Sequence, residues 1–197
     1  CIKSILPLVN KIYVVDSGST DNTFNICEKY KVSFFTNPWI NYAKQFNYGL
    51  DLVRENNFEW ILRIDADEIF STKLINEVKN CIDKNGENLS GLILKRRFIF
   101  QNKIIRYGGS TCKQLRIFRP HKGYCEDRYM DEHIKIEGKT KSLKEPFYDY
   151  SLKSLTWWIQ KHNLYSNREV VDILNLREEI KKDDYKLGLS AKIKRNL

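Results

Sequence analysis

The order of strand-like and helix-like segments in the first half of the chain is the strongest constraint on its fold. Short runs rich in β-branched and aromatic residues alternate with longer stretches in which apolar residues recur every three or four positions. The strand-like runs are 11–16, 32–35 and 60–64, and the helix-like stretches are 20–30, 41–54 and 74–82. Because this order is typical of β-α-β units, it predicts an α/β fold with a mostly parallel sheet and helices on its faces.

The second half of the chain has a different pattern. Segments 91–97, 113–119 and 134–137 resemble strands joined by irregular loops, and 151–176 has the spacing of a long helix. A chain of 197 residues is long enough for one domain with a sizeable core and short for two. We therefore expect a single domain over residues 1–197, in which a parallel half (1–90) is followed by a mixed half (91–150) and a C-terminal helical segment (151–197).

The first residues of the chain do not resemble a strand. Residues 1–6 read as the end of a helix. Since an α/β sheet of this type normally begins with a strand, we expect the chain to be a fragment that lacks its N-terminal strand.

Composition narrows the class of protein. No run approaches the roughly 18 apolar residues that a membrane span needs, and no N-terminal signal peptide is evident. The five cysteines are an odd number and form no C-x-x-C pair, which argues against a disulfide framework or a zinc site and for a reducing compartment. We expect a cytoplasmic location, at the inner face of the plasma membrane.

Basic residues are concentrated in two places, although the net charge of the whole chain is only +9. Residues 95–119 contain eight lysines and arginines and no acid, and residues 185–197 contain four and no acid. Such segments are either solvated faces or surfaces for phosphate-bearing partners, namely sugar nucleotides, anionic lipid headgroups or nucleic acid.

Acidic side chains follow two of the predicted strands. Asp16 ends the first, and Asp65 and Asp67 follow the third. In open α/β sheets ligands bind at the carboxyl ends of the strands, so these carboxylates are expected at one edge. Residues two apart in extended chain share a face, and paired carboxylates suit Mg²⁺ or Mn²⁺ bridging to substrate phosphates. The alternative is that Asp67 or Glu68 supports the start of the following helix.

The segment after Asp16 favours close approach of a ligand. Small residues in 17–20 form a predicted turn, and Ser19 or Thr20 is expected to cap the helix that follows. Backbone N–H groups at such a turn can face a ribose, a base or a phosphate.

These motifs together resemble a known family. Residues 14–23 (VVDSGSTDNT), 45–47 (QFN) and 65–68 (DADE) are similar to family 2 glycosyltransferases of the GT-A fold, in particular to the bacterial β-glucosyltransferases of lipopolysaccharide core biosynthesis. Weaker matches follow in the family's order at 108–109, 114–119, 131–132 and 150–154. The likeness implies a nucleotide-sugar-binding half over 1–90 and an acceptor-side half over 91–150.

The resemblance also implies chemistry and roles. It implies an inverting transferase that moves a sugar from a UDP-glucose-like donor to a hydroxyl of a cell-envelope glycan or glycolipid, assisted by Mg²⁺ or Mn²⁺ at a D-x-D motif. Asp16 would bind the base, Asp65 would lie by the ribose or metal, and Asp67 would ligate the metal. The nucleotide-sugar residues are Asp16, Ser17, Gly18, Ser19, Lys44, Gln45, Asn47, Asp65, Ala66 and Asp67, and the metal residues are Asp67 and Asp65.

The general base would come from the acidic segment 125–133. The resemblance implies Glu132, with Glu126, Asp127 and Asp131 as rivals. Two positions depart from the family. Relatives often carry a basic residue where this chain has Phe46, for which Lys44 is a substitute, and a histidine where it has Asp149. Expected partners are the donor, the acceptor and a peripheral membrane surface, without nucleic acid.

Two other functions fit parts of the sequence. A phosphatase of the haloacid-dehalogenase type also places D-x-D after an apolar strand, but residues 68–70 lack the small glycine-threonine continuation that it needs. A basic nucleic-acid-binding module would explain residues 95–100, in which cations alternate with aromatic rings, but no full recognition motif accompanies them.

Overall fold

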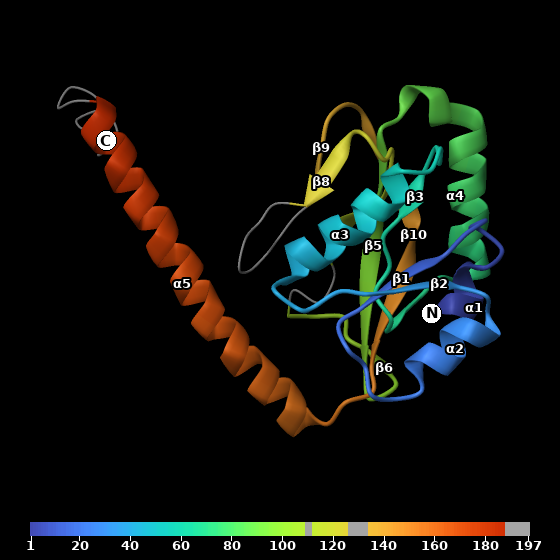
Figure 1. The fold of residues 1–197 in the computed structure, drawn as a ribbon, viewed down its shortest axis with the longest axis horizontal. Coiled ribbons are helices and arrows are strands. Elements are labelled where there is room, and N and C mark those ends of the chain that lie inside the picture. The colour runs from blue at the N-terminus through green and yellow to red at the C-terminus, as the bar shows by residue number, and fades with distance from the viewer. Residues whose placement is uncertain (109–111, 126–133, 188–197) are drawn as a thin grey trace. The chain divides into compact units, whose positions relative to one another are not determined.

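The computed structural model describes residues 1–108, 112–125 and 134–187, which fall into two compact units. The first unit contains all described residues up to Ser154, and the described part of the second is one long helix. Figure 1 labels the helices and strands of the two units. The prediction of a single domain that includes the C-terminal segment stays a prediction.

The first part of the chain forms a small parallel sheet with helices. After α1 (Ile2–Ile5), β1 (Tyr13–Asp16) and β2 (Ser33–Thr36) pair in parallel, from Tyr13 opposite Ser33 to Asp16 opposite Thr36. The helix α2 (Thr23–Lys29) connects them, and α3 (Tyr42–Arg54) follows. The predicted β-α-β order is therefore confirmed for this region.

The helix starts show why these segments fold as they do. The side chain of Asn41 accepts a hydrogen bond from the backbone N–H of Lys44 at 2.8 Å and so caps α3. The prediction for α2 was wrong, because its N-cap residue is Asn22 rather than Ser19 or Thr20. The Ser19 hydroxyl binds the carboxylate of Asp16 instead, so it is not available as a cap.

The larger sheet has six strands and is mixed. Its order is β3-β7-β5-β10-β4, with β6 paired to β5. Only β5 and β10 run parallel among these described pairs; the others are antiparallel. The strands are β3 (Ile61–Leu62), β4 (Glu68–Ile69), β5 (Gly91–Phe100), β6 (Lys103–Ile104), β7 (Lys113–Phe118) and β10 (Thr140–Ser151).

The twelve-residue strand β10 has no counterpart in the sequence-based expectation. Pro146 lies inside it, and proline argues against a central strand because it lacks the N–H that a ladder needs. The structure accommodates this proline where the register with β5 shifts, between Ser142 and Pro146. An irregularity of this kind is one of the few places where a paired strand tolerates proline.

The main core lies between this sheet and α4 (Thr72–Asn85), which is capped by Ser71 and packs beside β10 (Figure 1). A short 3₁₀ helix, η1 (Gly86–Asn88), follows it. Leu74 and Val78 of α4, Leu92 and Leu94 of β5 and Phe147 of β10 are fully buried there. Burying such side chains stabilises a fold by about 1.5–3 kcal/mol each. This core fixes the position of β4, and with it the end of the D-A-D-E segment.

A two-stranded antiparallel ribbon contacts α3. Its strands are β8 (Gly123–Cys125) and β9 (Ile134–Ile136). Arg54, in the last turn of α3, donates to the carbonyl oxygens of Pro120 at 3.0 Å and of Gly123 at 2.7 Å. The ribbon is thus anchored to the nucleotide-binding half that the sequence predicted.

The second unit is the helix α5 (Leu155–Leu187). It exposes many apolar side chains along its length, including Leu155, Ile159, Leu164 and Val170. Across the described residues, no helix has both the length and the apolarity that a membrane crossing requires.

Candidate functional site

Asp16 is held in place by the loop that follows it. Its Oδ2 accepts backbone N–H groups from Gly18 and Ser19, both at 2.7 Å, and its Oδ1 accepts the Ser19 hydroxyl at 2.5 Å. The hydrogen bond from the Ser19 side chain is the main reason why the pKa of Asp16 lies below its ordinary value. The carboxylate is therefore ionised and pre-oriented by residues within three positions of it.

The same loop leaves space for a ligand. Gly18 has a φ of 103°, a left-handed conformation that residues with a Cβ rarely adopt. A Cβ placed there would meet nothing within 4 Å, and Ser17 is also exposed. The small residues predicted to permit close approach therefore form an open surface beside Asp16.

The D-A-D-E segment forms a tight turn between β3 and β4. The backbone N–H of Asp65 donates to Oε2 of Glu68 at 2.9 Å, and the N–H of Glu68 donates to the carbonyl oxygen of Asp65 at 3.0 Å. The carbonyl oxygen of Asp67 accepts the N–H of Tyr150 from β10 at 2.9 Å. Glu68 thus acts on the turn itself, and Asp67 is tied to the sheet through its backbone.

A buried arginine forms ion pairs with two carboxylates of this turn. Nη2 of Arg116, on β7, forms an ion pair with Oε1 of Glu68 and a longer one, at 3.4 Å, with Oδ2 of Asp65. Arg116 and Glu68 are only 5% and 2% exposed, and the Arg116 guanidinium lies 5.2 Å from the Phe147 ring centroid. Charges this deeply buried are costly unless paired, so each of these two side chains depends on the other.

Burial has a second effect on Glu68. It raises the pKa of this carboxyl to about 7, because desolvation outweighs the attraction of Arg116, and the nearby charges of Asp65 and Asp149 act in the same direction as burial. Asp149 lies directly opposite Glu68 in the pairing of β10 with β4, and it forms an ion pair with Arg96 at 3.4 Å. Asp149, the position at which relatives often carry histidine, is therefore next to the D-A-D-E turn.

Two carboxylates of the turn face outward. The Asp65 side chain is 53% exposed despite its contact with Arg116. Asp67 is exposed, and its carboxylate has no hydrogen-bond or ion-pair partner among the residues described. Hard oxygen atoms of this kind suit Mg²⁺ or Mn²⁺. No group of three potential protein ligands is present in the described part of the chain, so a cation here would need substrate oxygens or water to complete its coordination.

The structure does not join the two acidic groups directly. No described hydrogen bond or ion pair links Asp16 to Asp65 or Asp67. Asp16 belongs to the β1–β2 sheet, whereas the D-A-D-E turn belongs to the six-stranded sheet. The expectation that the three carboxylates converge on one ligand stays a prediction.

Two of the predicted donor-binding residues on α3 have structural partners. The side-chain amide of Asn47 donates to the carbonyl oxygen of Cys125 at 3.0 Å and accepts its N–H at 3.1 Å. Gln45 accepts from Asn37 at 2.9 Å and donates to the carbonyl oxygen of Val15 at 3.4 Å. Gln45 therefore contacts β1 just before Asp16, and Asn47 anchors the end of β8.

Sequence reasoning missed two arginines. The guanidinium of Arg63 lies 4.8 Å from the ring centroid of Phe46, so a cation does occupy the neighbourhood in which relatives often carry a basic residue. Lys44, the substitute that the sequence suggested, is exposed. Arg116 was counted only as part of a basic segment, although it lies at a buried position between apolar residues of β7, where an unpaired charge is too costly.

The predicted general base cannot be placed. Glu132 lies outside the described residues, and so do its rivals Glu126, Asp127 and Asp131 and the neighbouring His133. Cys125, the last described residue before them, is the one that Asn47 holds.

Comparison with known proteins is consistent with this arrangement. The family model for glycosyl transferase family 2 matches residues 1–136. An uncharacterised glycosyltransferase of Rickettsia conorii is 26% identical over 193 residues, covering 88% of this chain and 64% of that protein. The lipopolysaccharide core biosynthesis glycosyltransferase LpsC of Rhizobium meliloti is 28% identical over 144 residues, covering 70% and 52%.

The relatives and the family model match different shares of the chain. The chain spans a little under two thirds of the length of the Rickettsia relatives. The family match, in contrast, covers more than half of the chain and includes β1, the Asp16 loop, α3 and the D-A-D-E turn. The α/β architecture with its curled mixed sheet agrees with the GT-A fold that this family implies. The chain belongs to glycosyl transferase family 2.

Proposed function

We propose that this chain carries the donor-binding part of an inverting glycosyltransferase. The enzyme would move a hexose, with glucose favoured, from a nucleoside diphosphate donor to a hydroxyl group of a cell-envelope glycan or glycolipid. The observation that carries the proposal is the D-A-D-E turn, in which a buried Glu68–Arg116 pair holds a backbone that presents the carboxylates of Asp65 and Asp67 to solvent.

The loop after β1 would bind the nucleoside. The Asp16 carboxylate is ionised and fixed, and the exposed turn at Ser17 and Gly18 leaves room for a flat base or a ribose. A carboxylate accepts hydrogen bonds only, so Asp16 would select N–H or hydroxyl donors of the nucleoside. Gln45 supports this loop from α3 through the carbonyl oxygen of Val15.

The turn after β3 would face the diphosphate. Its outward carboxylates offer hard oxygen atoms that suit a divalent cation, Mg²⁺ or Mn²⁺, whose remaining ligands would have to come from the donor or from water. Asp67 would be the main protein ligand, because its carboxylate is exposed and has no described protein partner, and Asp65 the secondary one. When bound, such a cation stabilises the negative charge on the departing diphosphate.

The remaining roles concern the acceptor. An acid from the segment that follows Cys125, with Glu132 and Asp131 as the candidates, would take the proton of the acceptor hydroxyl as its oxygen attacks the anomeric carbon. The bond from this carbon to the diphosphate oxygen breaks as the new bond forms on the opposite face, so the configuration inverts. LpsC, a lipopolysaccharide core enzyme by name, supports a cell-envelope acceptor.

A membrane-bound acceptor would require contact with the membrane surface. The exposed apolar side chains of α5, together with the acid-free basic tail in 185–197, suit peripheral attachment at the inner face of the plasma membrane.

The test measures release of nucleotide from UDP-glucose by the full-length protein, with membrane extract as acceptor source. We expect turnover that EDTA abolishes and Mn²⁺ or Mg²⁺ restores, and a loss of about 100-fold or more in Asp67→Asn. Asp83→Asn, which changes an exposed acid on α4, is the matched control and should keep full activity. Turnover that survives both EDTA and Asp67→Asn would contradict the metal assignment, and failure with every nucleotide-sugar tested would contradict the reaction.

A further inference from the structure

The structure divides the eight basic residues of segment 95–119 into two groups. Three arginines are used inside the fold, because each forms an ion pair with an acid of the same unit: Arg96, Arg116 and Arg119. The other five form no ion pair with any described residue, and they are Lys95, Arg97, Lys103, Arg106 and Lys113. The charges of this second group are therefore available to an anion from outside the chain.

Three of these unpaired cations lie together on one face of the larger sheet. Lys95 of β5 is directly opposite Lys113 of β7 in their antiparallel pairing. Arg97 follows two positions along β5, so its side chain is on the same face as that of Lys95. Strand geometry places the Cβ atoms of Lys113 and Arg97 about 5 Å and about 7 Å from that of Lys95. We call this group of three residues the cationic face.

The cationic face is on the side of the sheet that carries α3. Figure 1 shows α4 on one side of β5 and α3 on the other. Leu94 is fully buried in the main core with residues of α4, so alternation along β5 turns Lys95 to the opposite side. Leu115, two residues after Lys113 in β7, packs against the cluster that contains Leu50 of α3.

The positions of these cations require a counter-charge. Two lysines directly opposite each other in a β ladder repel, which destabilises the pair. Lys95 and Arg97 are also half-buried, so solvent screens their charges less than those of a fully exposed side chain. Their register partners on β10 are Pro146 and Tyr148, neither of which is acidic. An anion bound at the cationic face would remove the repulsion, and the Tyr148 hydroxyl beside Arg97 could donate to it.

The cationic face lies across the sheet from the D-A-D-E turn. The strand order is β5-β10-β4, and Arg97, Tyr148 and Ile69 are register partners in one row across these strands. Because β4 follows the turn directly, two strand spacings, about 10 Å, separate the cationic face from the strand that positions Asp67. This separation sets the cationic face apart from a diphosphate at Asp67 and leaves room between them for the sugar of an acceptor.

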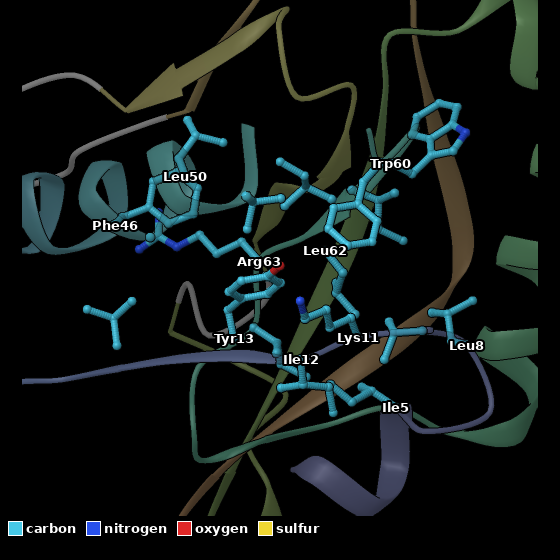
Figure 2. A pocket seen from close by; sticks show the side chains of 18 of the residues that line it. Ile5, Leu8, Lys11, Ile12, Tyr13, Phe46, Leu50, Trp60, Leu62 and Arg63 are labelled. Atoms are coloured by element: carbon cyan, nitrogen blue, oxygen red, sulfur yellow. The ribbon is translucent and has the colours of Figure 1, made fainter. Parts of the chain in front are cut away.

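The large cavity of the first unit does not offer a comparable group of cations. Its volume is about 700 Å³, and most of its lining is aliphatic or aromatic. The cations among its lining residues are Lys11 and Arg63, and their charged groups lie 4.9 Å and 4.8 Å from the ring centroids of Tyr13 and Phe46 (Figure 2). Each is thus already placed against an aromatic ring, whereas the cations of the cationic face have no such partner among the described residues.

We propose that the cationic face binds an anionic group, a phosphate or a carboxylate, on the acceptor glycan. This inference rests on the proposed function, and it makes the acceptor a negatively charged sugar rather than a neutral one. Arg97 can bind either group through two N–H donors, and the lysines add point charges. Three cations within about 7 Å suit a single anionic group, whereas nucleic acid needs a longer row of cations. A neutral sugar would leave the repulsion uncompensated, so the cationic face discriminates against it.

The first test measures binding of sugars without any transfer. Mannose 6-phosphate, galacturonate and mannose are titrated into the full-length protein, both alone and after saturation with UDP and Mn²⁺, which fill the donor site. We expect both charged sugars to bind about tenfold more tightly than mannose, or better, under either condition. Arg97→Gln and Lys113→Gln should each weaken binding of the charged sugars about tenfold, and should leave the affinities for mannose and UDP unchanged.

Lys103→Gln is the matched control for Lys113→Gln. Both lysines are exposed on strands of the same sheet, and neither forms an ion pair with a described residue. Lys103 is opposite Phe100 in the pairing of β6 with β5, which places it on the other face of the sheet. Lys103→Gln should therefore leave every affinity unchanged, and circular dichroism should show that all three variants are folded.

A second test identifies the anionic group on the natural acceptor. Membrane extract is treated with alkaline phosphatase, which removes phosphate monoesters, or with a carbodiimide and an amine, which converts carboxylates to amides. We expect one of the two treatments to reduce transfer from UDP-glucose about tenfold or more, and Lys103→Gln to retain full transfer to untreated extract. Transfer that survives both treatments would overturn the proposal.

Other results of the binding test would also overturn it. Charged and neutral sugars that bind equally, or equal losses in Lys103→Gln and Lys113→Gln, would show that the cationic face does not select an anion. Blocking of the charged sugars by UDP and Mn²⁺ would assign these cations to the donor instead. Loss of binding to phosphatidylglycerol vesicles in Arg97→Gln, with unchanged binding of charged sugars, would assign them to the membrane. Charged sugars that are preferred by a protein unable to bind UDP would contradict the proposed function alone.

Discussion

The two groups of acidic residues that follow strands are held in opposite ways. Asp16 is fixed by N–H and hydroxyl donors from its own loop, within three residues, at an exposed position. The D-A-D-E turn is fixed by Arg116, about fifty residues away, through an ion pair that is almost completely buried. The Asp16 loop needs only residues that are close in sequence. The exposed carboxylates of the D-A-D-E turn, in contrast, depend on the packing of the core.

Because the two groups are held differently, substitutions in them should differ in their effects on ligand binding and on the stability of the fold. Changes at the Asp16 loop should alter ligand binding and leave the fold intact, because solvent replaces the lost hydrogen bonds. Changes at Glu68 or Arg116 should destabilise the fold and the turn together, because they leave a buried charge without its partner.

The largest expected effect is that of Arg116→Met. It leaves the buried Glu68 without its cation and should reduce the free energy of unfolding by about 3–5 kcal/mol at pH 8. Urea denaturation followed by circular dichroism measures this. Arg97→Met, at a half-buried position on β5, should change stability by no more than about 0.5 kcal/mol. Equal effects of the two substitutions would show that the buried pair has no special role.

The next effect is a dependence of stability on pH. Because the pKa of Glu68 is raised from 4.5 to about 7 in the folded protein, the folded state binds a proton more readily than the unfolded state. The stability associated with that proton is complete below about pH 4.5 and is lost as the pH rises to 7. The difference is of the order of 3 kcal/mol.

The matched variant for this pH effect is Glu68→Gln, which does not titrate. The free energy of unfolding of the original chain, measured relative to this variant between pH 5 and pH 8, should fall as the pH rises. A relative stability that does not fall with pH over this range would mean that folding does not raise the pKa of Glu68, and that Arg116 offsets or outweighs burial.

A smaller effect is expected at the contact between α3 and β8. Asn47→Ala removes two hydrogen bonds to the backbone of Cys125 and should cost about 1–3 kcal/mol. Asn25→Ala, on the exposed surface of α2, is the control. If Asn47 has no structural role, the two variants should unfold at the same urea concentration.

The smallest stability effect is expected for Ser19→Ala in the Asp16 loop. The free energy of unfolding should change by no more than about 0.5 kcal/mol, because the loop is exposed. The pKa of Asp16 should nevertheless rise, since the Ser19 side chain is the main cause of its depression. Carbon-detected NMR titration of the Asp16 carboxyl measures this shift, and an unchanged pKa would contradict the hydrogen bond.

The sequence predicted the local features well. Strand and helix periodicity identified β1, α3 and α4, and the turn residues after Asp16 identified its loop, because each of these depends on residues close together in the chain. The family motifs at 14–23, 45–47 and 65–68 were recognisable for the same reason, because each is a continuous stretch of the sequence.

Features that depend on distant pairing were not predictable from pattern alone. β10 was not predicted, because Pro146 interrupts its strand pattern. Its place in the sheet also depends on pairing with β5, about fifty residues earlier. The partnership of Arg116 with Glu68 crosses from β7 to β4. An arginine within an apolar strand pattern signals that a partner exists, but only the folded sheet identifies that partner.

The most direct test of the account is calorimetric titration of UDP into the full-length protein, with Mn²⁺ and with EDTA. We predict that Mn²⁺ tightens UDP binding at least tenfold in the original protein and in Asp83→Asn, and that this enhancement disappears in Asp67→Asn while the fold persists by circular dichroism. An Asp67→Asn protein that retains the full enhancement by Mn²⁺ would contradict the claim that the D-A-D-E turn presents a metal ligand to the donor diphosphate.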